Sequence, residues 1–499
     1  MDGTRTKVLD DLLAWVTKPV NADAQSSGSN GNMFWLYGSP GLGKTSVANS
    51  LCDQLRISGN LGGSFFCKHD NPNLREPNRV LPTLIAKLAL MWGPYRKLVA
   101  KALLDDPQLS PQSTRGELLL RPLQSLKRHP PRPLVLVIDA VDECGQPNTR
   151  GALLKCLMDA CFKVHWLKVV VTSRPEHDIK AFFDRSRIAG RDLATDDLDG
   201  KDIRLFTERR MESVAIHRHL PSDWPGVERM GQIAKRSRGL FIFVDTLSRM
   251  VDVPNPESLL MDVLAGKLEG ANAELHKLYS AALTSRAVGH TEDLQLILRA
   301  VIAVSAHRPL CADTLATLIN IEASTVLSWV DELNSLLYQD GTQKYGIRVR
   351  HLSVLEFLVG PTCPPAFRSD LKLANSELAR CCLEIMANSL KFNICELETS
   401  CLFNEDVQDL HARVEQRIPD ALQYSCMHWS NHLCYDMDPF SAEITRLLDE
   451  FFMGSRPLYW IEALSLMGKV PVAISALRLM KSCFRVCTFT IHDDDTENL

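Results

Sequence analysis

Residues 33–55 read MFWLYGSPGLGKTSVANSLCDQL, and the rest of the chain is organised around this stretch. An apolar run breaks into a glycine-rich turn and resumes as an amphipathic pattern, which predicts a strand, a loop and a helix. The turn matches the pattern GxxxxGK(S/T) at Gly38, Ser39, Pro40, Gly41, Leu42, Gly43, Lys44 and Thr45, with Ser46 following. In this context the backbone N–H groups of the turn and the N-terminus of the helix form a cradle for phosphate groups.

Two side chains of the turn have chemical roles in this interpretation. Lys44 would reach the β- and γ-phosphates of a nucleotide, and the Thr45 hydroxyl would ligate Mg²⁺. The structural alternative is a surface turn that happens to contain glycines. The apolar strand before the turn and the apolar helix face after it disfavour that alternative.

Composition is that of an ordinary globular protein with several domains. Its 499 residues exceed the roughly 250 to 300 that one hydrophobic core supports. Apolar residues make up 45% of the chain and charged residues 23%, so disorder and fibrous structure are not indicated. The formal net charge of -4 gives no general attraction to nucleic acid or to anionic membranes.

The expected location is cytoplasmic. The N-terminus carries acidic residues where a secretory signal would carry basic ones. No apolar run approaches the roughly 20 residues that span a membrane, so no membrane association is expected. The 15 cysteines include no CxxC pair, which favours reduced thiols over a disulfide framework.

Strands alternate with helices over the first 200 residues. The segments 134–138 and 169–173 are apolar enough to be strands buried on both faces, and helical patterns separate them. This order predicts an α/β fold for residues 1–200, in which a P-loop NTPase parallel sheet has helices on both faces.

From residue 201 onward the pattern is mainly all-α. The segments expected here are a helical domain, a winged-helix domain, a C-terminal helical domain and a disordered acidic tail, at 201–290, 291–365, 366–490 and 491–499. The winged helix is inferred from amphipathic segments at 294–305, 312–319 and 324–337, which precede the hairpin-like sequence LYQDGTQKYGIRVRHLS.

Three acidic residues follow the apolar strand at 134–138. In parallel α/β sheets this edge binds ligands, and a carboxylate that ends an apolar strand is costly unless it has a partner such as Mg²⁺. We therefore predict that Asp139 holds Mg²⁺ together with Thr45, acting through water. Either Asp142 or Glu143 would orient and deprotonate the attacking water, with Glu143 favoured and Asp142 the second candidate. The structural alternative is that these two acids cap the following helix.

Arg174 ends the next strand and is predicted to lie at the same edge. A guanidinium there would read the γ-phosphate of a nucleoside triphosphate. The alternative is a surface ion pair between Arg174 and Glu176 or Asp178.

Together these motifs resemble the NACHT class of STAND P-loop NTPases, in particular the fungal heterokaryon-incompatibility group with a nephrocystin-type N-terminal domain. The similarity covers nearly the whole chain. FWLYGSPGLGKT is similar to the family's P-loop, VLVIDAVDEC to its Walker B strand and VVVTSRPE to its sensor strand. SFFCKHD and LPTLIAKLA match the second strand and its helix, and RGLFIFV matches the end of the first helical domain. Gly239-Leu240-Phe241 lacks the proline that relatives often place in the adenine pocket.

The resemblance implies further nucleotide-binding residues. A GTR match followed by Trp15 implies roles for Thr4 and Arg5. RVRHLSVLEFL is similar to the family's His-x-Ser-Phe-x-x-Phe-Leu segment, which implies that His351 contacts the β-phosphate of ADP and locks a closed state. Val354 stands where that segment has an aromatic residue. Without the resemblance, a histidine before an apolar helix is more often an ordinary packed residue.

The implied function is that of a signalling switch. Such a protein binds ATP or ADP, with GTP as an alternative, together with Mg²⁺, and acts as a slow NTPase. It self-assembles into a homo-oligomer in the triphosphate state and acts on a protein effector, here unknown, in fungal self/non-self recognition, innate immunity or programmed cell death. Neither Trp-Asp repeats nor an N-terminal effector domain is recognised in the 499 residues.

Two rival functions remain open. A winged helix could bind DNA through Lys344, Arg348 and Arg350, but three charges on an acidic chain favour a solvated hairpin and make nucleic acid an unexpected partner. The chain could instead be a scaffold with negligible turnover.

A metal site at Cys426, His428, His432 and Cys434 is also considered. On a helix the two histidines fall about 40° apart and the cysteines about 120° or more from them, so the four cannot converge on one ion. A site with two histidines would lack the three or four protein ligands that zinc normally has.

Overall fold

The computed structural model divides the chain into two compact units, Met1–Ala281 and Ala282–Leu499. The residues that it describes are 3–18, 31–106, 117–126, 129–196, 200–265, 270–286, 291–340, 346–399, 401–435 and 441–493.

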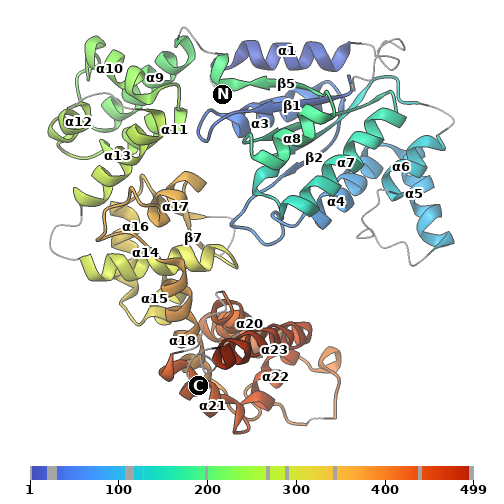
Figure 1. Ribbon diagram of the computed structural model, residues 1–499, viewed down its shortest axis with the longest axis vertical. Helices are drawn as coiled ribbons and strands as arrows, with labels where there is room; N and C mark the ends of the chain where they lie inside the picture. The colour runs from blue at the N-terminus through green and yellow to red at the C-terminus, as the bar shows by residue number, and fades with distance from the viewer. Residues whose placement is uncertain are drawn as a thin grey trace. The chain divides into compact units, whose positions relative to one another are not determined.

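The first unit is built on a five-stranded parallel sheet (Figure 1). Its strands lie in the order β2-β3-β4-β1-β5 and are β1 (Met33–Tyr37), β2 (Leu61–Phe66), β3 (Leu134–Asp139), β4 (Leu167–Ser173) and β5 (Ala189–Asp192). Every residue of β3 and β4 is buried, as their apolar sequences predict for central strands. The four-residue strand β5, AGRD, carries no apolar pattern that would predict it.

Helices cover both faces of this sheet. Leu136 and Ile138 of β3 belong to one apolar core, while Val135 and Val137 are buried on the opposite face. The core of the first face includes α4 (Pro77–Met91), α5 (Gly93–Asp105), α6 (Glu117–Gln124), α7 (Pro147–Lys163) and α8 (His177–Arg185). On the opposite face α3 (Lys44–Ile57) contacts the sheet, and α1 (Thr6–Thr17) packs on α3. The α/β part of the predicted fold class is therefore confirmed.

Helices follow the sheet, as expected from residue 201 onward. They are α9 (Lys201–His217), α10 (Val227–Ser237), α11 (Phe241–Met250), α12 (Pro256–Leu264) and α13 (Ala271–Thr284). All but the last residues of α13 belong to the same compact unit as the sheet. The finer division at residues 200 and 290 stays a prediction.

The second unit is mainly helical. Its first part contains α14 (Thr291–Ser305), α15 (Ala312–Ile319), α16 (Ala323–Glu332), an antiparallel hairpin of β6 (Leu337–Asp340) and β7 (Gly346–Val349), and α17 (Leu352–Val359). The predicted third helix, 324–337, was too long, because Leu337 opens β6 instead of ending the helix. The helices and hairpin occur in the expected order, but the winged-helix assignment stays a prediction.

Further helices complete the second unit. They are α18 (Leu371–Ser389), α19 (Leu410–Arg417), α20 (Asp420–Leu433), α21 (Ala442–Phe452), α22 (Arg456–Leu466) and α23 (Val470–Asp493). Helix α23 enters the range predicted as a disordered tail, and residues 494–499 lie outside the described part. Within the described ranges no helix has the length and apolar character needed to cross a membrane.

Candidate functional site

The phosphate cradle lies between β1 and α3. The loop from Gly38 to Gly43 connects them, and α3 begins at Lys44. Gly41 has φ 79°, a left-handed conformation that glycine adopts without strain, and a Cβ at this position would lie 2.1 Å from Ile242 Cγ2. Gly41 therefore permits both the turn and a close approach by α11.

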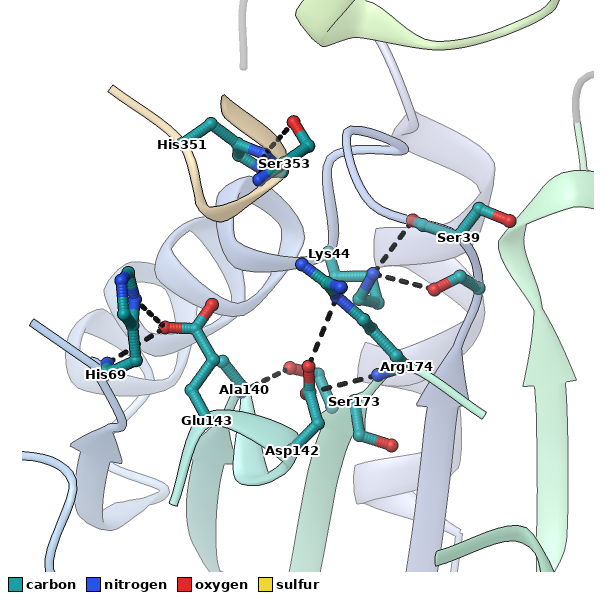
Figure 2. Close-up of polar contacts among 12 residues, drawn as sticks. Ser39, Lys44, His69, Ala140, Asp142, Glu143, Ser173, Arg174, His351 and Ser353 are labelled. Atoms are coloured by element: carbon teal, nitrogen blue, oxygen red, sulfur yellow. Dashed lines mark hydrogen bonds and ion pairs between the residues drawn. The ribbon is translucent and has the colours of Figure 1, made fainter. Parts of the chain in front are cut away.

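Lys44 folds back over this loop. Its Nζ donates to the carbonyl oxygens of Gly38 (2.8 Å) and Ser39 (2.9 Å), as Figure 2 shows. Burial lowers the pKa of Lys44 to about 8, although the nearby Asp142 favours the charged form. The predicted lysine thus lies in the cradle and within electrostatic reach of the loop at 139–145, which carries Asp139, Asp142 and Glu143 and is called the acidic loop below.

Asp139 and Thr45 meet at the carboxyl end of β3. Asp139 is 1% exposed, and burial raises its pKa to about 6, while hydrogen bonds with Thr172 and Thr45 oppose the rise. Thr172 of β4 also accepts a hydrogen bond from the N–H of Ala140 (3.0 Å), a residue held at φ 53°. A hydroxyl and a carboxylate are oxygen ligands of the kind that Mg²⁺ prefers, so the pair fits the predicted magnesium site.

Asp142 is bound to the end of β4. Its Oδ1 accepts from the backbone N–H of Arg174 (3.1 Å), and its Oδ2 lies 3.4 Å from Arg174 Nε. Burial, followed by repulsion from Glu143, raises the pKa of Asp142, and Lys44 and Arg174 oppose this. Arg174 does lie at the predicted edge, but it contacts Asp142, and Asp178 pairs instead with Arg150. Arg174 thus has a buried partner in Asp142, which the alternative of a surface pair with Glu176 or Asp178 did not include.

Glu143 faces a different neighbour, the turn after β2. Its Oε2 accepts from the backbone N–H of His69 (3.1 Å) and lies 3.5 Å from His69 Nδ1. Figure 2 shows Asp142 beside Arg174 and Glu143 beside His69, so the two adjacent acids point to different partners. The short helix η1 (Val141–Glu143) produces this divergence.

Arg5 lies beneath the cradle and is 2% exposed. Its Nη2 approaches the carbonyl oxygen of Leu42 (3.5 Å), its N–H donates to Asp202 (2.9 Å), and its guanidinium lies 5.3 Å from the Phe241 ring centroid. Thr4 is buried beside it. These contacts join α1 and α9 to the cradle, while direct nucleotide contacts by Thr4 and Arg5 stay a prediction.

Helix α11 also contacts the cradle. The Gly41 carbonyl accepts hydrogen bonds from the N–H groups of Phe241 (2.9 Å) and Ile242 (3.3 Å). Sequence reasoning compared this segment with an adenine pocket and did not foresee a bond to the loop backbone. The apolar RGLFIFV run is the only signal that would direct attention to it.

His351 belongs to the second unit, at the N-terminus of α17. Its Nδ1 accepts from the N–H of Ser353 (3.1 Å), so in the neutral imidazole Nε2 carries the proton. This is the tautomer with a donor for a phosphate oxygen. The role of His351 toward ADP stays a prediction.

The structure thus brings together Lys44, Thr45, Asp139, Asp142, Glu143 and Arg174. Sequence reasoning gave no role to Thr172, which bonds Asp139, or to His69, which bonds Glu143. Thr172 follows the apolar residues of β4 and His69 follows those of β2, and both strands pair with β3. Their position after an apolar strand is the sequence feature that could have indicated a place at the same sheet edge.

Comparison with known proteins adds a family match and a long sequence similarity. Residues 13–174 match the family described as nephrocystin 3, N-terminal. The vegetative incompatibility protein HET-E-1 of Podospora anserina is 24% identical over 524 residues, which cover 97% of this chain. The chain spans 37% of the length of that relative.

Solved structures show only distant similarity. A structure of RuvB from Thermotoga maritima has a TM-score of 0.27 and 19% identity, covering 69% of this chain and 92% of that one. Cdc6p of Pyrobaculum aerophilum has a TM-score of 0.32 and 12% identity, covering 71% and 93%. Similarities at this level carry no argument about function. The family match over residues 13–174 and the similarity to HET-E-1 along 97% of the chain, together with the P-loop, support a place among the NACHT-type P-loop NTPases of the heterokaryon-incompatibility family.

Proposed function

We propose that this chain is a nucleotide-dependent signalling switch. It binds ATP or ADP with Mg²⁺, hydrolyses ATP slowly and self-assembles in the triphosphate state, in fungal self/non-self recognition or programmed cell death. The observation that carries the proposal is the double connection of the phosphate loop. Gly41 is bonded to α11, while Lys44 interacts electrostatically with the acidic loop.

This double connection suits a switch because it lets bound phosphate influence elements outside the sheet. A γ-phosphate would attract Lys44 away from the carbonyls of Gly38 and Ser39. Movement of the loop backbone would be transmitted through the Gly41 carbonyl to the first turn of α11. ATP and ADP must differ in affinity for two conformers, because a ligand that binds both equally shifts no population.

The acids of the site have separate roles in this proposal. Glu143 takes the proton of the attacking water, whose oxygen bonds to the γ-phosphorus as ADP leaves. Asp142 holds Arg174 instead of acting as the base, because its carboxylate already pairs with the guanidinium and the backbone N–H. To contact the γ-phosphate, the Arg174 guanidinium must give up part of its ion pair with Asp142.

Nucleotide binding by the purified full chain tests the proposal. We expect ADP or ATP to co-purify and to be replaced by a fluorescent analogue, whose binding Lys44→Ala strongly weakens. If the chain binds neither nucleotide, or if Lys44→Ala binds as the wild type does, the proposal fails. Light scattering with a non-hydrolysable ATP analogue, with ADP as control, tests assembly.

The DNA-binding alternative finds no support at the hairpin. Arg348 is 3% exposed and its Nε lies 3.1 Å from Asp340 Oδ2, while Arg350 bonds the Asn334 carbonyl. Lys344 lies outside the described residues. Salt-dependent retention on duplex DNA would revive this alternative.

The scaffold alternative differs from the switch in turnover alone. Steady-state phosphate release separates the two, with Glu143→Gln as the background. Release at the background rate by the wild type would favour the scaffold.

A further inference from the structure

We propose that His69 is a positioning residue for Glu143, and that the turn carrying it forms a clamp on the acidic loop. This inference rests on the proposed function, in which Glu143 is the base for hydrolysis. His69 follows β2, whereas Glu143 follows β3, so the contact joins the ends of two neighbouring strands.

The contacts of His69 restrain one carboxylate oxygen. Its backbone N–H (3.1 Å) and its Nδ1 (3.5 Å) both approach Oε2 of Glu143. The hydrogen bond from the backbone N–H and the adjacent imidazole restrain the direction of the carboxylate, and Figure 2 shows the other oxygen pointing away from His69. A base for water activation needs such a fixed direction, because small displacements of a catalytic group reduce the rate strongly.

The turn itself is internally bonded and can serve as a rigid support. Lys68 N–H donates to the Leu74 carbonyl (3.3 Å), Asn71 N–H to the Lys68 carbonyl (3.1 Å), and Asn73 N–H to the Asn71 side chain (2.9 Å). Asp70 is also buried, at 3% exposure. His69 is therefore placed by its neighbours and not by contact with Glu143 alone.

Two backbone bonds attach this turn to the acidic loop on either side of Glu143. Cys67 N–H donates to the Asp139 carbonyl (3.0 Å), and Gly145 N–H donates to the Arg75 carbonyl (2.8 Å). The segment 67–75 thus brackets the acidic loop, with the His69 contact between the two bonds.

The partners of the two acids explain why the clamp acts on Glu143. Asp142 is already engaged by the guanidinium and the backbone N–H of Arg174, although burial raises its pKa. An imidazole and a backbone N–H withdraw less charge, so they orient Glu143 while leaving it able to accept a proton.

The experiment measures single-turnover ATP hydrolysis and ATP affinity of the full chain with His69→Ala and His69→Asn. We expect His69→Ala to slow hydrolysis about tenfold with the dissociation constant changed less than about twofold, because the residue acts on the base and not on the nucleotide. Asn carries a side-chain N–H near the position of Nδ1 and should recover most of the rate. His177→Ala, an exposed position on α8, is the matched control.

A double variant separates positioning from general structural damage. In the Glu143→Gln background, His69→Ala should cause no further loss of rate, because the group that it positions has already lost its function. An equal tenfold loss there, a wild-type or faster rate in His69→Ala, or a parallel loss of affinity would overturn the inference. If Glu143→Gln itself hydrolyses ATP at the wild-type rate, Glu143 is not the base and that part of the proposed function is wrong. The preceding outcomes would instead refute only the role of His69.

Discussion

Two of the regions with buried titratable side chains, the sheet edge of the first unit and a histidine cluster of the second, differ in the partners of the buried groups. In the first unit, Asp139, Asp142 and Lys44 stand at the sheet edge beside a residue at positive φ, Ala140. In the second unit, the imidazoles of His428 and His432 pack in a cluster. Both regions look alike as lists of buried ionisable residues.

The histidine cluster is closed by neutral hydrogen bonds. His432 Nδ1 donates to Asn375 Oδ1 (2.8 Å), so Nε2 accepts from the Tyr424 hydroxyl (2.7 Å). The His307 and His428 rings stack with centroids 5.3 Å apart. These bonds occupy both nitrogens of His432, which makes it unsuitable as a metal ligand. The comparison teaches that burial of ionisable groups does not by itself mark a functional site.

The largest effects are expected from Asp142 and Glu143. Substituting one should mainly change stability, and substituting the other should mainly change activity. Glu143→Gln should lower ATP hydrolysis about 100- to 1,000-fold and leave folding intact, because it removes the base. Asp142→Asn should instead lower the free energy of unfolding by about 3 kcal/mol, because Arg174 loses its buried partner. Phosphate release and urea denaturation check the two results. Equal effects of both variants on hydrolysis would contradict the separate roles.

The second-largest effect is expected from the lysine of the phosphate cradle, Lys44. Lys44→Ala should weaken ATP binding about 100-fold, since it removes a charged donor from a partly buried phosphate site. Calorimetric titration measures the loss, and Lys180→Ala, which removes an exposed lysine that pairs with Asp184, is the control. Similar affinities for the two variants would remove Lys44 from the binding site.

Lowering the pH should reduce the free energy of unfolding through the histidine cluster. Burial, together with the charge of His307 and Arg308, lowers the pKa of His428 to about 3 from 6.5. Between these values the unfolded chain takes up a proton that the folded chain does not, so stability falls as pH drops below 6.5. The expected loss is about 2 kcal/mol by pH 5.

Urea denaturation of the wild type and of His428→Gln at several pH values measures this loss. The variant should show the shallower dependence on pH, because one titrating group is gone. Parallel curves would show that His428 is not a buried neutral group.

The smallest effect tests whether a histidine of the second unit can be functional. His351→Ala should weaken ADP binding about tenfold and ATP binding much less, if Nε2–H contacts the β-phosphate of the closed state. Competition binding with both nucleotides gives the ratio. Equal losses for ADP and ATP would remove His351 from the locking role and make it a helix-capping residue only.

Much of the site follows from the sequence because it consists of short local patterns. The turn GSPGLGKT, the acids after an apolar strand and the arginine after the next one are recognisable where they stand. Parallel strands bring their carboxyl ends to one edge, so the meeting of Lys44, Asp139 and Arg174 could be predicted without coordinates. Periodicity was less useful at β5 and at the end of α16, where short or mixed segments carry no clear pattern.

Only the tertiary structure decided which partner each charged group has. Asp142 and Glu143 are adjacent in sequence, yet η1 turns one toward Arg174 and the other toward His69. Gly41 matches a sequence pattern, but its bond to α11 joins residues two hundred positions apart. The physical reason is that hydrogen bonds and ion pairs depend on distances of a few ångströms between distant segments, whereas a phosphate-binding turn depends on the backbone preferences of consecutive residues.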